Sequence, residues 1–113
     1  MDVEHATLYA MDPKVAKCLL VSKVLVADGI MTENERIFLD KVMRGLGLSD
    51  DERRGVLDLE GWDQAEPVVA KLSAQERRDL LGMLVDAASA DGRLSPLEMQ
   101  TVKRITVALG LEA

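Results

Sequence analysis

The stretch Ala27-Asp28-Gly29-Ile30-Met31-Thr32-Glu33-Asn34-Glu35 occurs a second time as Ala90-Asp91-Gly92-Arg93-Leu94-Ser95-Pro96-Leu97-Glu98. In both copies an Asp-Gly pair is followed by a hydroxyl residue and, three positions later, by glutamate. Asp-Gly is typical of a tight turn. Thr/Ser-x-x-Glu is the capping box with which many helices begin. The repeated stretch therefore predicts, at two places in the chain, a turn that leads into a helix.

The similarity continues on both sides of this stretch at the same shift of 63 residues (90 − 27). The apolar run 19–27 falls on 82–90, and Leu46-Gly47-Leu48 falls on Leu109-Gly110-Leu111. A run that is apolar on most helical faces predicts a central, buried helix. We therefore expect one all-α domain spanning residues 1–113, a compact duplicated helical bundle. Its pseudo-two-fold-related halves, about 13–48 and 74–111, surround two central long helices, and an acidic segment at 49–73 connects them.

Other signals also predict helices. Asp12-Pro13 combines an N-cap residue with proline at the first helical position. Ser49 to Glu52 and Ser73 to Glu76 are further capping boxes. Between them, Gly61-Trp62 predicts a break, and Glu66-Pro67 predicts the start of a short helix. We found no strand signals, such as alternating apolar residues between Asn-Gly turns.

The amino-acid composition limits the classes of function that this chain can have. The net charge of −6 and the 3% aromatic content argue against nucleic-acid binding. The acidic N-terminus lacks the features of a secretory signal, and the longest apolar stretch is interrupted by charges, so we expect a cytoplasmic protein without membrane insertion. A single cysteine and a single histidine offer no recognisable nucleophile–base pair, and we expect no enzyme and no catalytic residues.

The repeated stretch has the spacing of the second half of an EF-hand calcium loop. The first half does not fit, because Val24 and Val26 occupy positions that require acidic ligands. A true EF-hand is therefore excluded. If the two turns lie close together, however, their pooled carboxylates could hold a divalent cation of unknown identity. The candidate metal ligands, two from each copy, are Asp28, Glu35, Asp91 and Glu98.

A purely structural explanation stays open beside the metal site. Helix capping explains both glutamates and the hydroxyl residues before them. Turn formation explains the two Asp-Gly pairs. Cys18 lies on a crowded apolar helix, which favours packing over reactivity. Trp62 is expected to fill the core between the halves. The acidic segment at 49–66 favours a solvated surface, although it could also extend a patch for cations or a basic partner.

The duplicated unit, a buried helix running into Ala-Asp-Gly-x-x-(Thr/Ser)-x-x-Glu and a helix ended by Leu-Gly-Leu, resembles the TerB-like family over about residues 14–112. This family is named for a tellurite-resistance protein and also supplies the N-terminal domain of a DnaJ-type co-chaperone. The resemblance implies an all-helical duplicated fold, a role in stress response, and either metal binding by the four acids or scaffolding of other proteins. The compact middle segment, 50–72, and the lack of a partner domain depart from longer family members.

Two functions thus stay open at the level of sequence. The first is a small acidic domain that binds a divalent cation at its Asp-Gly turns. The second is a non-enzymatic protein–protein interaction module, or co-chaperone-like scaffold, without a metal. We expect a protein partner of unknown identity in either case, and a homodimer is also possible.

Overall fold

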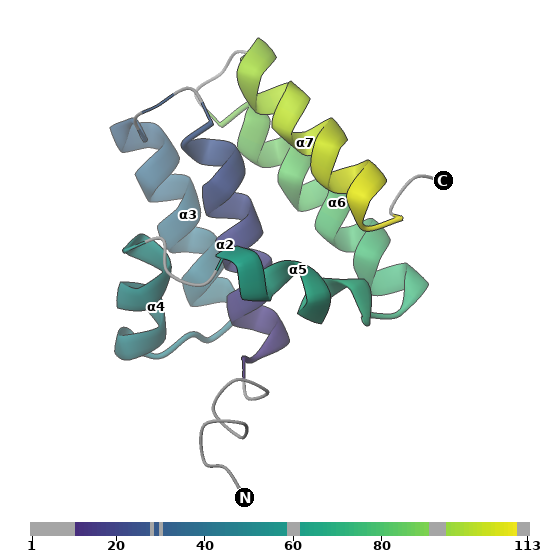
Figure 1. Cartoon of the computed structure of the whole chain (residues 1–113). Helices are drawn as coiled ribbons and strands as arrows, with labels where there is room; N and C mark the ends of the chain where they lie inside the picture. The colour runs from purple at the N-terminus through teal and green to yellow at the C-terminus, as the bar shows by residue number, and fades with distance from the viewer. Residues whose placement is uncertain (1–10, 28, 30, 59–61, 91–94, 111–113) are drawn as a thin grey trace, which may run out of the picture.

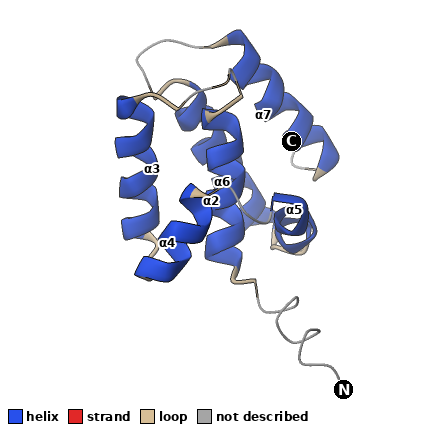
Figure 2. Cartoon of the chain, turned by 60° about the vertical axis from the view of Figure 1, so that its left-hand side comes forward, coloured by secondary structure: helices blue, strands red, loops and turns tan. Residues whose placement is uncertain are grey.

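The computed structural model describes residues 11–27, 29, 31–58, 62–90 and 95–110, and these residues form helices and no strand. The prediction of an all-α fold is therefore confirmed, as Figure 2 shows. In chain order, the helices are α2 (Pro13–Leu25), α3 (Glu33–Gly45), α4 (Asp50–Leu57), α5 (Trp62–Ala70), α6 (Ala74–Ala88) and α7 (Pro96–Ala108) (Figure 1).

Helix α2 forms the centre of the fold, as its apolar composition predicts. It packs against α3, α4, α5, α6 and α7. Most of its side chains are buried, among them Leu19, Leu20 and Val24. A helix buried on most of its faces must meet neighbours in several directions. The other helices are therefore arranged around α2, and the Cα radius of gyration of 13.6 Å is that of a compact domain.

Side-chain caps fix where the helices begin. Asp12 accepts a hydrogen bond from the Lys14 amide at 2.8 Å and opens α2. Thr32, Ser49 and Ser73 are the N-caps of α3, α4 and α6, each in a complete capping box. Each cap satisfies amide groups that have no partner inside the helix and contributes about 1 kcal/mol. These starts agree with the sequence prediction because capping depends only on residues close together in the chain.

The helix bounds agree with the 63-residue shift. Moved by this shift, α3 (33–45) coincides with α7 (96–108), and α2 and α6 end at equivalent residues. Gly47 and Gly110 follow α3 and α7 with positive φ angles of 78° and 64°. Helices α2 and α6 pack against each other, with α3 and α7 on opposite sides of the pair (Figures 1 and 2). A two-fold axis relating the two halves stays a prediction.

The prediction for the middle segment was wrong in one respect. Helix α5 begins at Trp62, where we expected a break, and Pro67 lies inside it instead of at its start. An interior proline removes one backbone hydrogen bond and costs about 3 kcal/mol. Packing offsets this cost, because Ala65 and Val69 are fully buried and α5 lies against α2. No described helix has the length and apolarity needed to cross a membrane.

Two glycine substitutions should change the free energy of unfolding in opposite directions. Gly47→Ala should lower it by about 1 kcal/mol, because the backbone there has a positive φ that alanine disfavours. Gly82→Ala should raise it by about 0.5–1 kcal/mol, because Gly82 lies within α6 and an added Cβ meets open space. Urea unfolding of both variants measures the two changes. Changes of the same sign would contradict this account of the two positions.

Candidate functional site

The helix ends that border the two Asp-Gly turns lie at the same end of the bundle. The carboxyl ends of α2 and α6 and the amino ends of α3 and α7 are all at the top of Figure 1. The predicted ligands Asp28 and Asp91 lie outside the described residues, so the distance between their carboxylates stays untested. The described helix ends that flank the two turns nevertheless lie at one end of the bundle.

Glu35 lies in the first turn of α3 and is only 2% exposed. Its Oε1 atom accepts a hydrogen bond from the Thr32 amide at 2.8 Å, and the Thr32 hydroxyl accepts one from the Glu35 amide at 3.2 Å. The predicted capping box is therefore complete. Capping employs one carboxylate oxygen of Glu35 and leaves Oε2 as a potential ligand atom.

Glu98 occupies the equivalent position in α7 and is also 2% exposed. The Ser95 hydroxyl accepts a hydrogen bond from the Glu98 amide at 3.3 Å and so caps the helix. Glutamate is almost never fully buried in proteins unless its charge is compensated. The two turns are thus each followed by a buried glutamate at the same helical position, a burial that the sequence alone does not reveal.

The described residues do not make a metal site by themselves. Within them, no group of three or more Asp, Glu, His or Cys side chains lies close enough to hold an ion. A site formed by Glu35 and Glu98 would therefore need the aspartates of the turns as well. Such a ligand set contains only carboxylates, which suits hard cations such as Mg²⁺, Ca²⁺ and Mn²⁺.

Comparison with protein families gives the identification. The family model described as tellurite resistance protein TerB matches residues 57–113, which is half of the chain. This chain belongs to the TerB family. The matched part includes α5, α6, α7 and the second Asp-Gly turn. For residues before Leu57, the likeness to TerB rests on the internal repeat. Comparison with curated proteins and with solved structures gives no significant match.

A polar link inside this TerB domain joins α2 to α5. The Trp62 indole N–H donates to the Ser22 hydroxyl at 3.1 Å, and Ser22 donates to the Leu19 carbonyl at 2.7 Å. Lys23 lies 5.8 Å from the centre of the Trp62 ring and pairs with Glu66 at 3.5 Å. Trp62 therefore packs against the core, and its expected place between the two halves stays a prediction. No local sequence signal connects these residues, because the link depends on how two helices pack.

Cys18 does not have the environment of a reactive thiol. Its side chain is fully buried in α2, and burial raises the pKa of the thiol to about 12. Because the thiolate is the nucleophilic form, a thiol with this pKa is about one part in ten thousand ionised at pH 8. The packing role predicted for Cys18 agrees with this position.

Native protein should therefore react very slowly with Ellman's reagent at pH 8, whereas the urea-unfolded chain should react at the rate of a free cysteine. Up to pH 10 the thiolate fraction of native Cys18 should rise about tenfold per pH unit and still stay at about one part in a hundred or less, since its pKa is about 12. The absorbance of the released thiolate measures both rates. Equal rates for the native and unfolded protein would show that Cys18 is accessible.

Proposed function

We propose that this TerB domain binds a hard divalent cation at its Asp-Gly turns, with Asp28, Glu35, Asp91 and Glu98 as the ligands. The observation that supports this proposal is the burial of Glu35 and Glu98 at equivalent positions, each in the helical turn that follows an Asp-Gly pair. Four carboxylates at one end of the bundle would repel one another, and a divalent cation would offset that repulsion.

The role of each residue follows from its place in the chain. Asp28 and Asp91 precede the glycines of the two turns, where a carboxylate can approach an ion from the loop. Glu35 can contribute the oxygen that does not cap α3. Calcium takes six to eight oxygen ligands and magnesium six, so water would complete the coordination of either ion. The hydrogen bonds that cap α3 and α7 can persist when an ion is bound.

The cellular role that we propose is a non-enzymatic one in the cytoplasm, in a stress response of the tellurite-resistance type. Membership of the TerB family supports the connection with tellurite. We propose no catalytic group, because the sequence has only one histidine and one cysteine.

Calorimetric titration of the purified chain with Mg²⁺, Ca²⁺, Mn²⁺ and Zn²⁺ tests the proposal. We expect saturable binding of at least one of the three hard cations, whose preferred ligands are oxygen atoms. If none of the four ions produces a binding signal, the proposed function is wrong and the four acids serve capping and turn formation only.

A second candidate function is an interaction module, or co-chaperone-like scaffold, that needs no metal. It is favoured by large aliphatic side chains that reach the surface, namely Ile37, Leu57, Val85, Leu97 and Val107. Exposed large aliphatic side chains can serve as contacts for a partner protein. Recovery of the same partner in repeated pull-downs from the native host supports this alternative, and gel filtration tests the homodimer.

A further inference from the structure

A groove between the start of α2 and the second half of α5 presents mainly apolar side chains. It has a volume of about 640 Å³, and its apolar lining consists of Met11, Pro13, Pro67, Val68 and Leu72. Met11, Val68 and Leu72 are half-buried and pack on the core, whereas the two proline rings are exposed. The polar lining is Asp63, Gln64 and Lys71, in which one acid offsets one base. The groove therefore suits an apolar, uncharged occupant.

The chain itself brings such an occupant to the groove. Met11, which lines the groove, is the first described residue, and the uncharged stretch Ala6-Thr7-Leu8-Tyr9-Ala10 directly precedes it. Because an extended chain spans at most about 3.6 Å per residue, the backbones of Tyr9 and Leu8 lie within about 7 and 11 Å of that of Met11. A tethered segment this short has an effective concentration on the order of millimolar at the groove. Any separate ligand must compete with it.

We propose that residues 6–10 of this chain occupy the groove, with the side chains of Leu8 and Tyr9 packed on its apolar lining. Their burial removes apolar surface from water on the segment and on α5 together, which stabilises the docked arrangement. The charged residues Asp2 and Glu4 lie further along the chain from Met11 and need no place in the groove. The segment thereby closes this face of α5 to other ligands. The proposal goes beyond cation binding and does not depend on it.

Nuclear Overhauser effects of the Tyr9 ring test the proposal directly. Tyr9 is the only tyrosine of the chain, so its ring signals are unambiguous. The full chain, with ¹³C-labelled Ile, Leu and Val methyl groups, is measured in the presence of a chelator. We expect Overhauser effects from the Tyr9 ring to the methyl groups of Val68 and Leu72. Their absence, or contacts of Tyr9 only with methyl groups outside the groove, overturns the proposal.

Two double variants of the segment supply the matched control. Leu8→Ser with Tyr9→Ser should shift the methyl signals of Val68 and Leu72, because the nearby aromatic ring is lost. Asp2→Ser with Glu4→Ser changes the same number of residues and should leave these signals in place. Circular dichroism verifies that each variant is folded.

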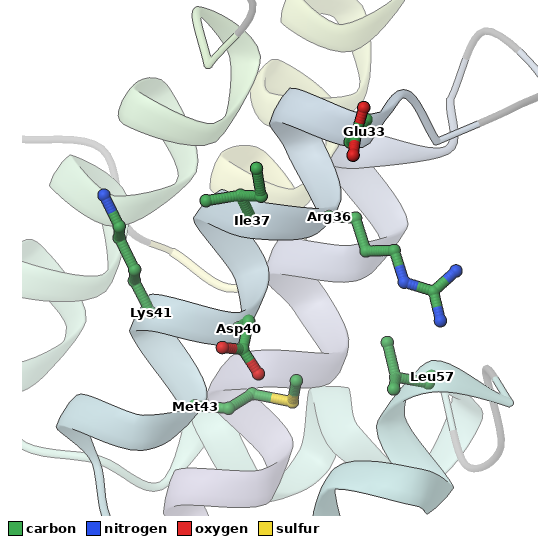
Figure 3. Close-up of a pocket in the computed structure, with 7 residues that line it drawn as sticks. All are labelled: Glu33, Arg36, Ile37, Asp40, Lys41, Met43 and Leu57. Carbon is green, nitrogen blue, oxygen red and sulfur yellow. The ribbon is translucent and has the colours of Figure 1, made fainter.

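A second groove, between α3 and α4, supplies the internal reference. Ile37 and Leu57 line it (Figure 3), and their methyl signals should not shift in either double variant. Equal shifts of Val68 and Leu72 in both variants, no shift in either, or equally large shifts of the reference signals would overturn the assignment to the groove beside α5.

Two further measurements separate this proposal from its alternatives. Substitution of Asp28 and Asp91 by asparagine should leave the Tyr9 contacts intact, so failure of the cation proposal does not affect this result. A mixture of unlabelled chain with methyl-labelled, otherwise deuterated chain tests a second copy as the source of the segment, because only the unlabelled chain then carries ring protons. We expect no Overhauser effect from Tyr9 to the labelled methyl groups. Its appearance would assign the groove to the segment of another copy and would overturn the proposal.

Discussion

Leu20→Ala is expected to lower the free energy of unfolding by about 2–5 kcal/mol, the largest stability effect of any substitution that we consider. Leu20 is completely buried in α2. Because α2 packs against every other described helix, a cavity there removes contacts at the centre of the fold. The cost combines the lost hydrophobic burial of the side chain with the cavity left behind. It is a large fraction of the 5–15 kcal/mol that stabilises a typical domain.

Urea unfolding measured by circular dichroism gives this free energy directly. Val107→Ala is a suitable control, because it also shortens an aliphatic helical residue but at a position that is 63% exposed. The control should change the free energy of unfolding by no more than about 0.5 kcal/mol. A loss below about 1 kcal/mol for Leu20→Ala would mean that α2 is not the centre of the core.

Simultaneous replacement of Asp28 and Asp91 by asparagine is expected to weaken cation binding by at least about tenfold. Asparagine keeps the size and the turn preference of aspartate, but it removes the negative charge that attracts the ion. Because the change should leave the helices unaltered, the loss would appear in calorimetry without a matching loss of helical circular dichroism. Each single substitution should produce part of the effect if the two turns share one ion.

Two control variants make this result specific. Asp51→Asn with Asp79→Asn removes the same number of exposed carboxylates from α4 and α6, and cation affinity should not change. Thr32→Ala removes the cap of α3, which should cost about 1 kcal/mol of stability and leave the ligand atoms in place. Equal binding by the wild-type protein and the Asp28/Asp91 double variant would contradict the assignment of these residues as ligands.

Features of the fold that depend on neighbouring residues could be predicted from the sequence. The N-caps Thr32, Ser49, Ser73 and Ser95 were all correct, because a cap is formed within four residues. The first three form complete capping boxes, whereas at Ser95 the structure records the bond to the hydroxyl alone. The central position of α2 also followed from its composition. The start of α5 was not predictable in this way, since burial of Ala65 and Val69 against the core outweighs the proline inside the helix.

The candidate sites were predictable to a smaller extent. The repeat singled out Glu35 and Glu98, but only the fold shows that both are buried. The link between Ser22 and Trp62 could not be foreseen, because these residues lie on helices that only the packing brings together. Contacts between side chains of different helices can be identified only when the packing of those helices is known.

The central claim is that both Asp-Gly turns bind the same cation. Titration of ¹⁵N-labelled protein with Mn²⁺ tests it most directly, because this paramagnetic ion broadens the amide signals of nearby residues. We predict that the signals of Gly29 and Ser95, which belong to different turns, broaden together at substoichiometric Mn²⁺, while that of Gly55 in α4 stays sharp. Broadening at one turn only, at neither turn, or uniformly over the chain would contradict the claim.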